Sequence, residues 1–533
     1  MGAPASAQDG AGADSGRGRV SIRLAMAMFV LVVDTSLMNV SIAAVGRDLD
    51  TTVSGVQSAI ALEALVSAAF ILVGSKVADL IGRRRAFVLG LIGYAIGALA
   101  MTLAQDLLAI IVLWAIVGGL GASLLLPSMQ ALIHGNFTGD ARRRTYASVG
   151  AAAAIAAAVG PLLGGFVTTF LSWRVGFALE VVVIAVVLSG IRLIGDAPYD
   201  GPRTVDPVGA ALSAVGMGGV VVGILAWQEG GESVGALVAV GLVALGSLAW
   251  WLRRRKRKGK PTLLDPDLFR AALFRLGIVS QMLQNVALGG AMIALPIFLQ
   301  MVLEYDALQT GLTLAPLSLT MFATATIAGK RAGWRRPSAM IRLGAGLLTV
   351  GMAALVPLVP RADSGWVLVV PLVVAGAGFG LLVSQLNNDT LSPISEERIS
   401  EAAGVNSAAG SFGLSFGLAC AGAVMLATLA IAFTDMANAS DVLDLAAKEQ
   451  VAQALEDDAE VLSTTLLDEQ LAGQPPAVRA EIVDINDDAR TLALQVALLV
   501  PVLAGTLGVL NATRMTRRPD PAPAESVERT ALA

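Results

Sequence analysis

Runs of about 20 apolar residues recur along nearly the whole chain of 533 residues, and this repetition constrains the fold more than any other feature. About 20 apolar residues is the length that crosses a bilayer as an α-helix. Charged residues make up only 15% of the chain and the mean hydropathy is +0.73, whereas a soluble domain carries roughly a quarter charged residues. The runs also lack the alternation of barrel strands. The sequence therefore predicts an all-α integral membrane protein.

The apolar runs divide into fourteen predicted spans. The first 19 residues are small and polar, and we expect them to be disordered. Asp34 lies within the first run, where a cleaved signal peptide would carry no charge, so we expect this run to be retained as a span. The predicted limits are 20–44, 54–78, 86–104, 107–130, 146–169, 174–194, 207–227, 234–252, 276–302, 309–329, 338–359, 366–389, 402–433 and 491–512.

Basic residues alternate from side to side along the predicted spans. With the N-terminus in the cytoplasm, all but six of the 37 Lys and Arg fall on the cytoplasmic side. This asymmetry follows the positive-inside rule and an even number of spans. We therefore expect both termini to be cytoplasmic and the protein to lie in a bacterial-type plasma (inner) membrane. The six exceptions are Arg47, Arg174, Arg361, Lys448, Arg479 and Arg490.

The predicted outer loop at 434–490 is long and acidic, with 14 acidic and 3 basic residues. Apolar side chains recur in it at intervals of three and four, which predicts an amphipathic helix between Ala452 and Leu466. The loop is either a solvated cap or a surface that attracts cationic substrates.

A weak internal repeat predicts two related six-span halves. A basic, glycine-containing loop follows the second span at 74–85, and a similar one follows the tenth span at 329–336. Parallel six-span halves are a transporter architecture with the substrate site between the halves. The predicted organisation is a disordered N-terminus (1–19), a six-helix bundle (20–194), two inserted spans with a basic linker (195–275), a second six-helix bundle (276–512) with the outer loop, and a cytoplasmic tail (513–533).

The loop at 74–85 carries the most specific motif. An aspartate at the end of a predicted helix stands beside arginines, where a charge-assisted pair can form and break. The flanking glycines permit a tight turn and close helix approach. This pattern resembles the signature between the second and third spans of the major facilitator superfamily, and the resemblance implies a gating role. The residues concerned are Gly74, Asp79, Gly82, Arg83, Arg84 and Arg85.

Two further motifs extend the resemblance. The segment 160–165 in the fifth span contains Gly160, Pro161, Gly164 and Gly165, and it resembles the span 5 signature of the antiporter branches. Its small residues allow close helix packing and its proline bends a helix. A conformational role is implied, and an ordinary packing seam is the alternative.

The segment 34–40 in the first span resembles the aspartate motif of the fourteen-span drug:proton antiporters. A carboxylate at mid-span, here Asp34, is costly unless it is protonated, paired or hydrated, so we expect a proton-coupling function.

Glu63 and Glu180 are further carboxylates within predicted spans that could take up protons. They depart from the family, which usually has an aromatic residue near the first position and asparagine near the second. For Glu180, an ion pair with Arg174 is an alternative to function. Ala115 stands where the family carries an arginine associated with proton coupling. Either coupling is lost, or it depends on Asp34 with Glu63.

Carboxamide side chains gather in the later spans. They either line the transport path or form interhelical hydrogen bonds. The predicted path residues are Asn39, Gln284, Asn285, Gln385, Asn387, Asn388 and Asn406.

The resemblance implies a major facilitator fold with two inserted helices, and a secondary exporter of hydrophobic or cationic small molecules coupled to proton influx. The alternatives are a dedicated exporter of one lipid, antibiotic or metabolite, with or without proton coupling, and a non-transporting membrane sensor or assembly partner. The expected partners are the substrate, protons and membrane lipid. With a single cysteine (Cys420), a single histidine (His134), and neither a catalytic triad nor a nucleotide-binding loop, we expect no enzyme activity, catalytic residue, metal, cofactor, nucleotide or nucleic acid.

Overall fold

The computed structural model describes residues 6–137, 139–196, 206–228, 234–330, 336–394, 398–443, 467, 471 and 474–518. Within these ranges the regular elements are all helices, which confirms the predicted fold class. Thirteen of the described helices are long and apolar enough to span a membrane. The remaining predicted span corresponds to α7 (Trp173–Ser189), a helix of 17 residues. Such a helix rises about 26 Å, the lower limit for crossing a bilayer.

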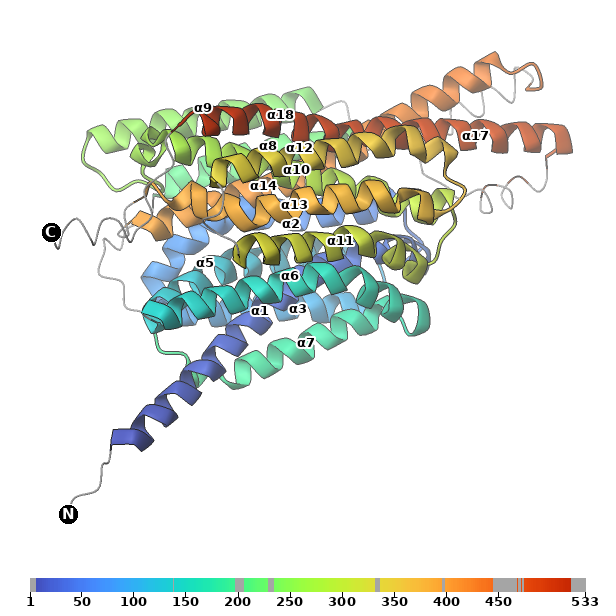
Figure 1. The fold of residues 1–533 in the computed structure, drawn as a ribbon. Coiled ribbons are helices and arrows are strands. Elements are labelled where there is room, and N and C mark those ends of the chain that lie inside the picture. The colour runs from blue at the N-terminus through green and yellow to red at the C-terminus, as the bar shows by residue number, and fades with distance from the viewer. Residues whose placement is uncertain are drawn as a thin grey trace.

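The first half of the chain forms one group of antiparallel helices. Its helix α1 packs against α6 and α7, while α3 packs against α5 and α7 (Figure 1). The bounds are α1 (Ser6–Asp48), α2 (Val53–Ile81), α3 (Arg83–Leu103), α4 (Leu107–Ala109), the π-helix η1 (Ile110–Gly118), α5 (Gly119–Asn136), α6 (Gly139–Phe170), α7 and the 3₁₀ turn η2 (Ile191–Leu193).

The second half repeats this arrangement, with α10 packed against α14 and α18, and α12 against α13 and α18. The bounds are α10 (Ala272–Ile297), the π-helix η4 (Phe298–Val302), α11 (Ala307–Lys330), α12 (Pro337–Leu358), the 3₁₀ turns η5 (Val359–Arg361) and η6 (Gly365–Leu368), α13 (Val369–Leu391), α14 (Ile399–Ala439), α17 (Pro476–Ala497) and α18 (Leu499–Thr516).

Local sequence signals fix several helix ends. Thr52 precedes α2, and its hydroxyl accepts the Gly55 N–H at 3.0 Å. Asp106 caps α4 in the same way by accepting the Ala109 N–H at 2.7 Å. These side chains satisfy backbone donors that a helix start leaves unpaired. Gly82 has a φ of 99°, and this left-handed conformation lets α2 end and α3 begin with no further linker.

The two halves meet along α2 with α14 and along α6 with α11. Figure 1 shows α6 and α11 side by side. A Cβ atom on Gly165 of α6 would lie 2.4 Å from the Ala307 carbonyl oxygen, and one on Gly311 of α11 would lie 2.2 Å from the Pro161 carbonyl oxygen. Only glycine fits at these crossings, because the backbones of the two halves are in contact.

The inserted helices α8 (Pro207–Gln228) and α9 (Val234–Arg257) pack on each other, and α8 also contacts α2 and α14. Ion pairs fasten the following linker to α9 and to the second half. Lys256 contacts Asp265, and Arg398 at the start of α14 lies 2.6 Å from the same carboxylate. Burial acts to raise the pKa of Asp265, but the Lys256 hydrogen bond and the Arg398 charge outweigh it and hold that pKa below its ordinary value.

The two ends of the bundle differ in charge. We call the end where α1 begins and α18 ends the basic end, because the arginines at 83–85 and 254–255 lie there. The opposite end, beyond which α17 projects in Figure 1, is the acidic end. There α17 exposes Asp484, Asp487 and Asp488.

Two segment predictions differ from the structure. The helix α1 reaches back to Ser6, although we expected residues 1–19 to be disordered. Adding residues to an existing helix costs little free energy, because each added residue gains a backbone hydrogen bond. Likewise α17 begins at Pro476, inside the predicted outer loop, because Ile482 and Ile485 are buried and the helix packs against α14. The amphipathic helix predicted between 452 and 466 lies outside the described residues.

Candidate functional site

Asp34 lies in the interior of the first half and is only 1% exposed. The Tyr94 hydroxyl on α3 donates to one of its carboxylate oxygens at 2.5 Å. The Trp114 Nε1–H in η1 lies 3.3 Å from each oxygen. Two neutral donors therefore hold a carboxylate that would otherwise be costly to bury.

Glu180 on α7 joins this group and is 3% exposed. Within the part of the chain that the structure describes, no N–H or hydroxyl donates to its carboxyl, and the polar group that it meets is the Asp34 carboxyl. A hydrogen bond between two carboxyls requires a proton on one of them. The two carboxyls therefore repel each other unless one of them is protonated.

The alternative ion pair of Glu180 with Arg174 is wrong. Arg174 instead pairs with Asp48 and donates to the Ala104 carbonyl oxygen at 2.6 Å. Its position in the first turn of α7 directs it toward the loop at the helix end, whereas Glu180 lies two turns deeper.

Glu63 on α2 completes the group and is half-buried. It lies within electrostatic range of Asp34 and Tyr94. Its backbone is pressed against α5, since a Cβ on Gly119 would lie 2.9 Å from the Glu63 carbonyl oxygen. Among the described ion pairs, none involves Asp34, Glu63 or Glu180.

Sequence reasoning missed Tyr94 and Trp114. Trp114 directly precedes Ala115, the position where the resemblance implied an arginine. It lies in the π-helix η1, and its ring packs edge-on against Phe177 with centroids 6.4 Å apart. π-Helical segments inside α-helices are frequent at functional sites. The signal available in the sequence was a polar aromatic residue at mid-span in two helices.

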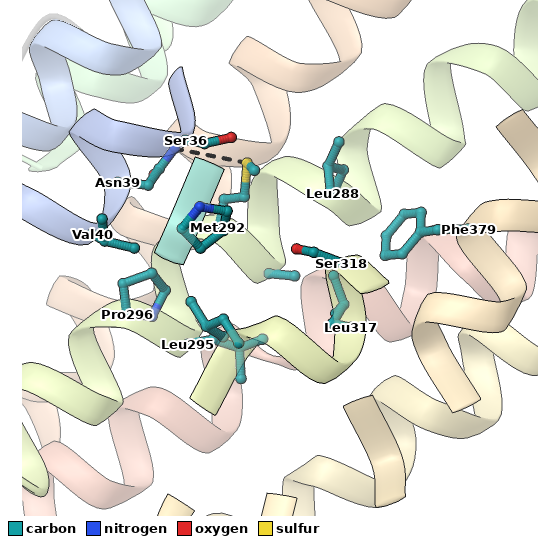
Figure 2. A pocket seen from close by; sticks show the side chains of 13 residues that line it. Ser36, Asn39, Val40, Leu288, Met292, Leu295, Pro296, Leu317, Ser318 and Phe379 are labelled. Carbon is teal, nitrogen blue, oxygen red and sulfur yellow. Dashed lines mark hydrogen bonds between the residues drawn. The ribbon is translucent and has the colours of Figure 1, made fainter. Parts of the chain in front are cut away.

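A cavity, with about 460 Å³ of empty space that includes open solvent, lies between the two halves (Figure 2). Most of its wall is apolar, and α1 contributes Ser36, Asn39 and Val40. The remaining lining residues are Pro161, Leu288, Ala291, Met292, Leu295, Pro296, Leu314, Leu317, Ser318 and Phe379. A mostly apolar wall with a few polar groups is typical of small-molecule sites.

The other predicted path residues lie elsewhere in the second half. Gln284 lines a separate pocket inside that half, with an empty volume of about 250 Å³. Asn406 donates to Asn387 at 2.9 Å. Asn285 donates to the Gln281 carbonyl oxygen at 2.9 Å, and Gln385 donates to Ser384 at 3.3 Å. Asn388 is exposed. Of the seven predicted path residues, Asn39 alone is among the described residues that line the central cavity.

A pair of interhelical hydrogen bonds joins the halves toward the acidic end. The Gln300 carboxamide, in η4, accepts the Ala43 N–H at 3.2 Å and donates to the Val40 carbonyl oxygen at 3.1 Å. The next residue, Met301, accepts a hydrogen bond from the buried Arg490 at 2.8 Å through its carbonyl oxygen. Gln300 therefore holds the backbone of α1 at two points, from a turn that is itself anchored to α17.

The predicted gating residues of the loop at 74–85 lie together at the basic end. Arg83 approaches Asp79 at 3.6 Å, and the Arg84 N–H donates to Asp196 at 3.0 Å. A Cβ on Gly74 would lie 2.4 Å from the Ser123 carbonyl oxygen. The motif thus joins α2, α3 and the segment after α7, while Arg85 is exposed.

The residues of the segment 160–165 lie where α6 crosses α1 and α11. A Cβ on Gly160 would lie 2.5 Å from the Ser36 side chain, and one on Gly164 would lie 2.9 Å from Leu37. These glycines therefore allow α6 to pack closely against both α1 and α11.

Comparison with known proteins gives a consistent result. The family model described as Major Facilitator Superfamily matches residues 24–210 and again residues 203–418. The chain is 28% identical over 408 residues to the multidrug resistance protein Stp of Mycobacterium tuberculosis, covering 75% of this chain and 74% of that protein. It is 28% identical over 418 residues to the puromycin resistance protein pur8 of Streptomyces alboniger, covering 76% of this chain and 82% of that protein.

A solved structure shares the fold. The crystal structure of a bacterial homologue of the human lysosomal transporter Spinster, in an inward-facing and unoccupied conformation, superposes with a TM-score of 0.62 at 13% identity. The match covers 95% of this chain and 99% of that one.

Proposed function

Since the chain belongs to the major facilitator superfamily, and is therefore a multi-pass membrane transporter rather than an enzyme, we propose that it exports hydrophobic or cationic small molecules in exchange for protons. Its relatives include multidrug and antibiotic resistance proteins. Protons and membrane lipid are the other partners in this proposal.

One observation carries the proposal: α1 carries the Asp34 carboxyl on one side and lines the cavity with the other. Asp34 faces Tyr94 and Trp114 inside the first half, while Ser36, Asn39 and Val40 of the same helix line the cavity between the halves. A proton taken up at Asp34 changes the charge on one side of α1, and a substrate contacts the other side. Coupling follows only if each conformation binds proton and substrate differently, and α1 is the element that both ligands contact.

The proposed cycle uses the two ends of the bundle in turn. Substrate enters between the halves from the basic end, which we propose is cytoplasmic, as the positive-inside rule implies. The Gln300 contact with α1 holds the acidic end closed in this state. Loss of a proton from the Asp34 and Glu180 pair to the cytoplasmic side, with Glu63 nearby, favours release of that contact. The halves then rock so that the basic end, where the Asp79 and Arg83 cluster lies, closes. Substrate leaves at the acidic end, and a proton taken up from that side reloads the pair.

The proposed organisation is two six-helix bundles that move against each other, with α8 and α9 inserted between them. In this scheme Gly165 lies on the surface along which α6 moves against α11, while Gly160 and Gly164 hold α6 close to α1 within the first bundle. The gating and proton-coupling roles are proposals that are supported by the contacts described above.

Transport into everted vesicles under an imposed pH gradient tests the proposal. A screen of labelled compounds should identify substrates whose accumulation requires the gradient and collapses when a protonophore is added. Accumulation that persists at the same rate without a gradient would contradict proton coupling, and the absence of flux for every compound would contradict export.

A further inference from the structure

Within the proposed function, on which this inference rests, we propose that the central cavity binds uncharged, mainly apolar molecules that carry a hydrogen-bond donor, and that it discriminates against permanent cations. The inference narrows the substrate class of the site from its lining.

The cavity wall offers no counter-charge. Among the described residues that line it, none is charged, and the polar ones are Ser36, Asn39 and Ser318. A cation moved from water into such a wall loses its hydration without gaining an ionic partner. An apolar, uncharged molecule has no ionic hydration to lose on entering the cavity. It gains van der Waals contact with Met292, Leu295 and Phe379.

The nearest carboxyl on the same helix is turned away from the cavity. Asp34 is 1% exposed, and it is held on the opposite face of α1 by Tyr94 and Trp114. Glu63 and Glu180 are likewise absent from the lining. These carboxyls are placed to exchange protons within the first half, and they do not contact the cavity.

The polar groups of the wall indicate which hydrogen-bonding group the ligand carries. Asn39 is 3% exposed, and its Nδ2 donates to the Thr35 carbonyl oxygen at 2.7 Å. Its Oδ1 has no hydrogen-bond partner among the described residues, and such a buried acceptor is costly unless a ligand or water supplies a donor. In Figure 2 the Ser318 hydroxyl lies toward Met292 across the same space. A ligand hydroxyl or N–H would satisfy the Asn39 acceptor.

Three labelled probes with one apolar body separate charge from hydrogen bonding. They are 4-(hydroxymethyl)biphenyl, its methyl ether, and (biphenyl-4-ylmethyl)trimethylammonium. Equilibrium binding to the full-length purified protein, without any pH gradient, should give an affinity for the alcohol about tenfold or more above that for the ammonium. The ether should bind more weakly than the alcohol in the wild type, and equally in Asn39→Leu.

A gain-of-function variant sharpens the test. Ser318→Asp places a carboxylate in the cavity and should reverse the preference toward the ammonium probe. Asn438→Asp adds the same charge at an exposed position of α14 and should leave both affinities unchanged. Wild-type binding of the ammonium as tight as that of the alcohol would overturn the inference, and so would binding of neither probe. Selective binding of the alcohol without gradient-driven flux would overturn the proposed export alone.

Discussion

The Tyr94 hydroxyl lies 2.5 Å from an Asp34 carboxylate oxygen and donates to it, which joins α3 to α1 in the interior of the first half. Together with Trp114, this contact holds a buried carboxylate by neutral donors. A proton can therefore reach Asp34 without breaking an ion pair.

Tyr94→Phe removes the hydroxyl donor and leaves the ring. A hydrogen bond to a charged group contributes about 1.5–3 kcal/mol, so Asp34 should lose its proton less readily. The pH at which gradient-driven flux is half-maximal should rise by about one unit or more. Tyr146→Phe is the matched control, because that hydroxyl is on an exposed side chain and donates to the Gln130 carbonyl oxygen. An unchanged pH profile in Tyr94→Phe would contradict the role given to this contact.

Gln300→Leu removes both hydrogen bonds to the α1 backbone. Each is worth about 1 kcal/mol, so the closed state at the acidic end should become less populated, by about tenfold or more. A cysteine introduced at Leu314, in a Cys420→Ala background, should then react faster with an impermeant maleimide added from the acidic side. Gln309→Leu removes an exposed carboxamide that bonds locally at the start of α11, and it should not change the labelling rate. Equal rates in all three proteins would refute the closing role of Gln300.

Asp79→Asn weakens the contact with Arg83 at the basic end. We expect the variant to insert normally but to transport about tenfold more slowly or worse, because one closed state loses a charge-assisted contact. Asp106→Asn, at the opposite end of the first half, is a control in which the new side chain can still cap α4. Wild-type transport in Asp79→Asn would show that the motif does not gate.

Asp265→Asn loosens the linker that Lys256 and Arg398 hold. The pKa of Asp265 is depressed in the folded protein, so its stabilisation is present above the unfolded value near 4 and is lost as pH falls through the folded pKa. The variant should therefore melt lower than wild type by the same small amount at pH 6 and pH 8, equivalent to about 1 kcal/mol or less. This difference in melting temperature should disappear below about pH 4. A difference in melting temperature that grew on acidification would contradict the depressed pKa of Asp265.

The fold could be predicted because span length and loop charge are set by the bilayer itself. The apolar runs gave the helices, although the predicted limits of 54–78 for the second span fell short of α2, which lies between Thr52 and Gly82. The site was harder to predict for a physical reason. In a membrane both the lipid and the neighbouring helices are apolar, so the pattern along a span does not say which face is turned inward. Asp34 and Asn39 were both identified, but not their placement on opposite sides of α1.

Tyr94, Trp114 and Gln300 illustrate the same limit. Each is a single polar group in an apolar span, and its partner lies on another helix far away in sequence. Nothing in the local spacing distinguishes them from packing residues. The π-helices η1 and η4, which carry Trp114 and Gln300, are also departures from regular periodicity that a helical pattern does not reveal.

The central claim is that Asp34 couples proton movement to transport, and proteoliposome flux measured against pH for wild type and Asp34→Asn tests it most directly. The variant keeps the cavity face of α1, so it should bind 4-(hydroxymethyl)biphenyl with wild-type affinity. Under an imposed pH gradient it should accumulate no substrate at any pH, while the wild type accumulates substrate in proportion to the gradient. Wild-type, gradient-driven flux in Asp34→Asn at every pH would contradict the account.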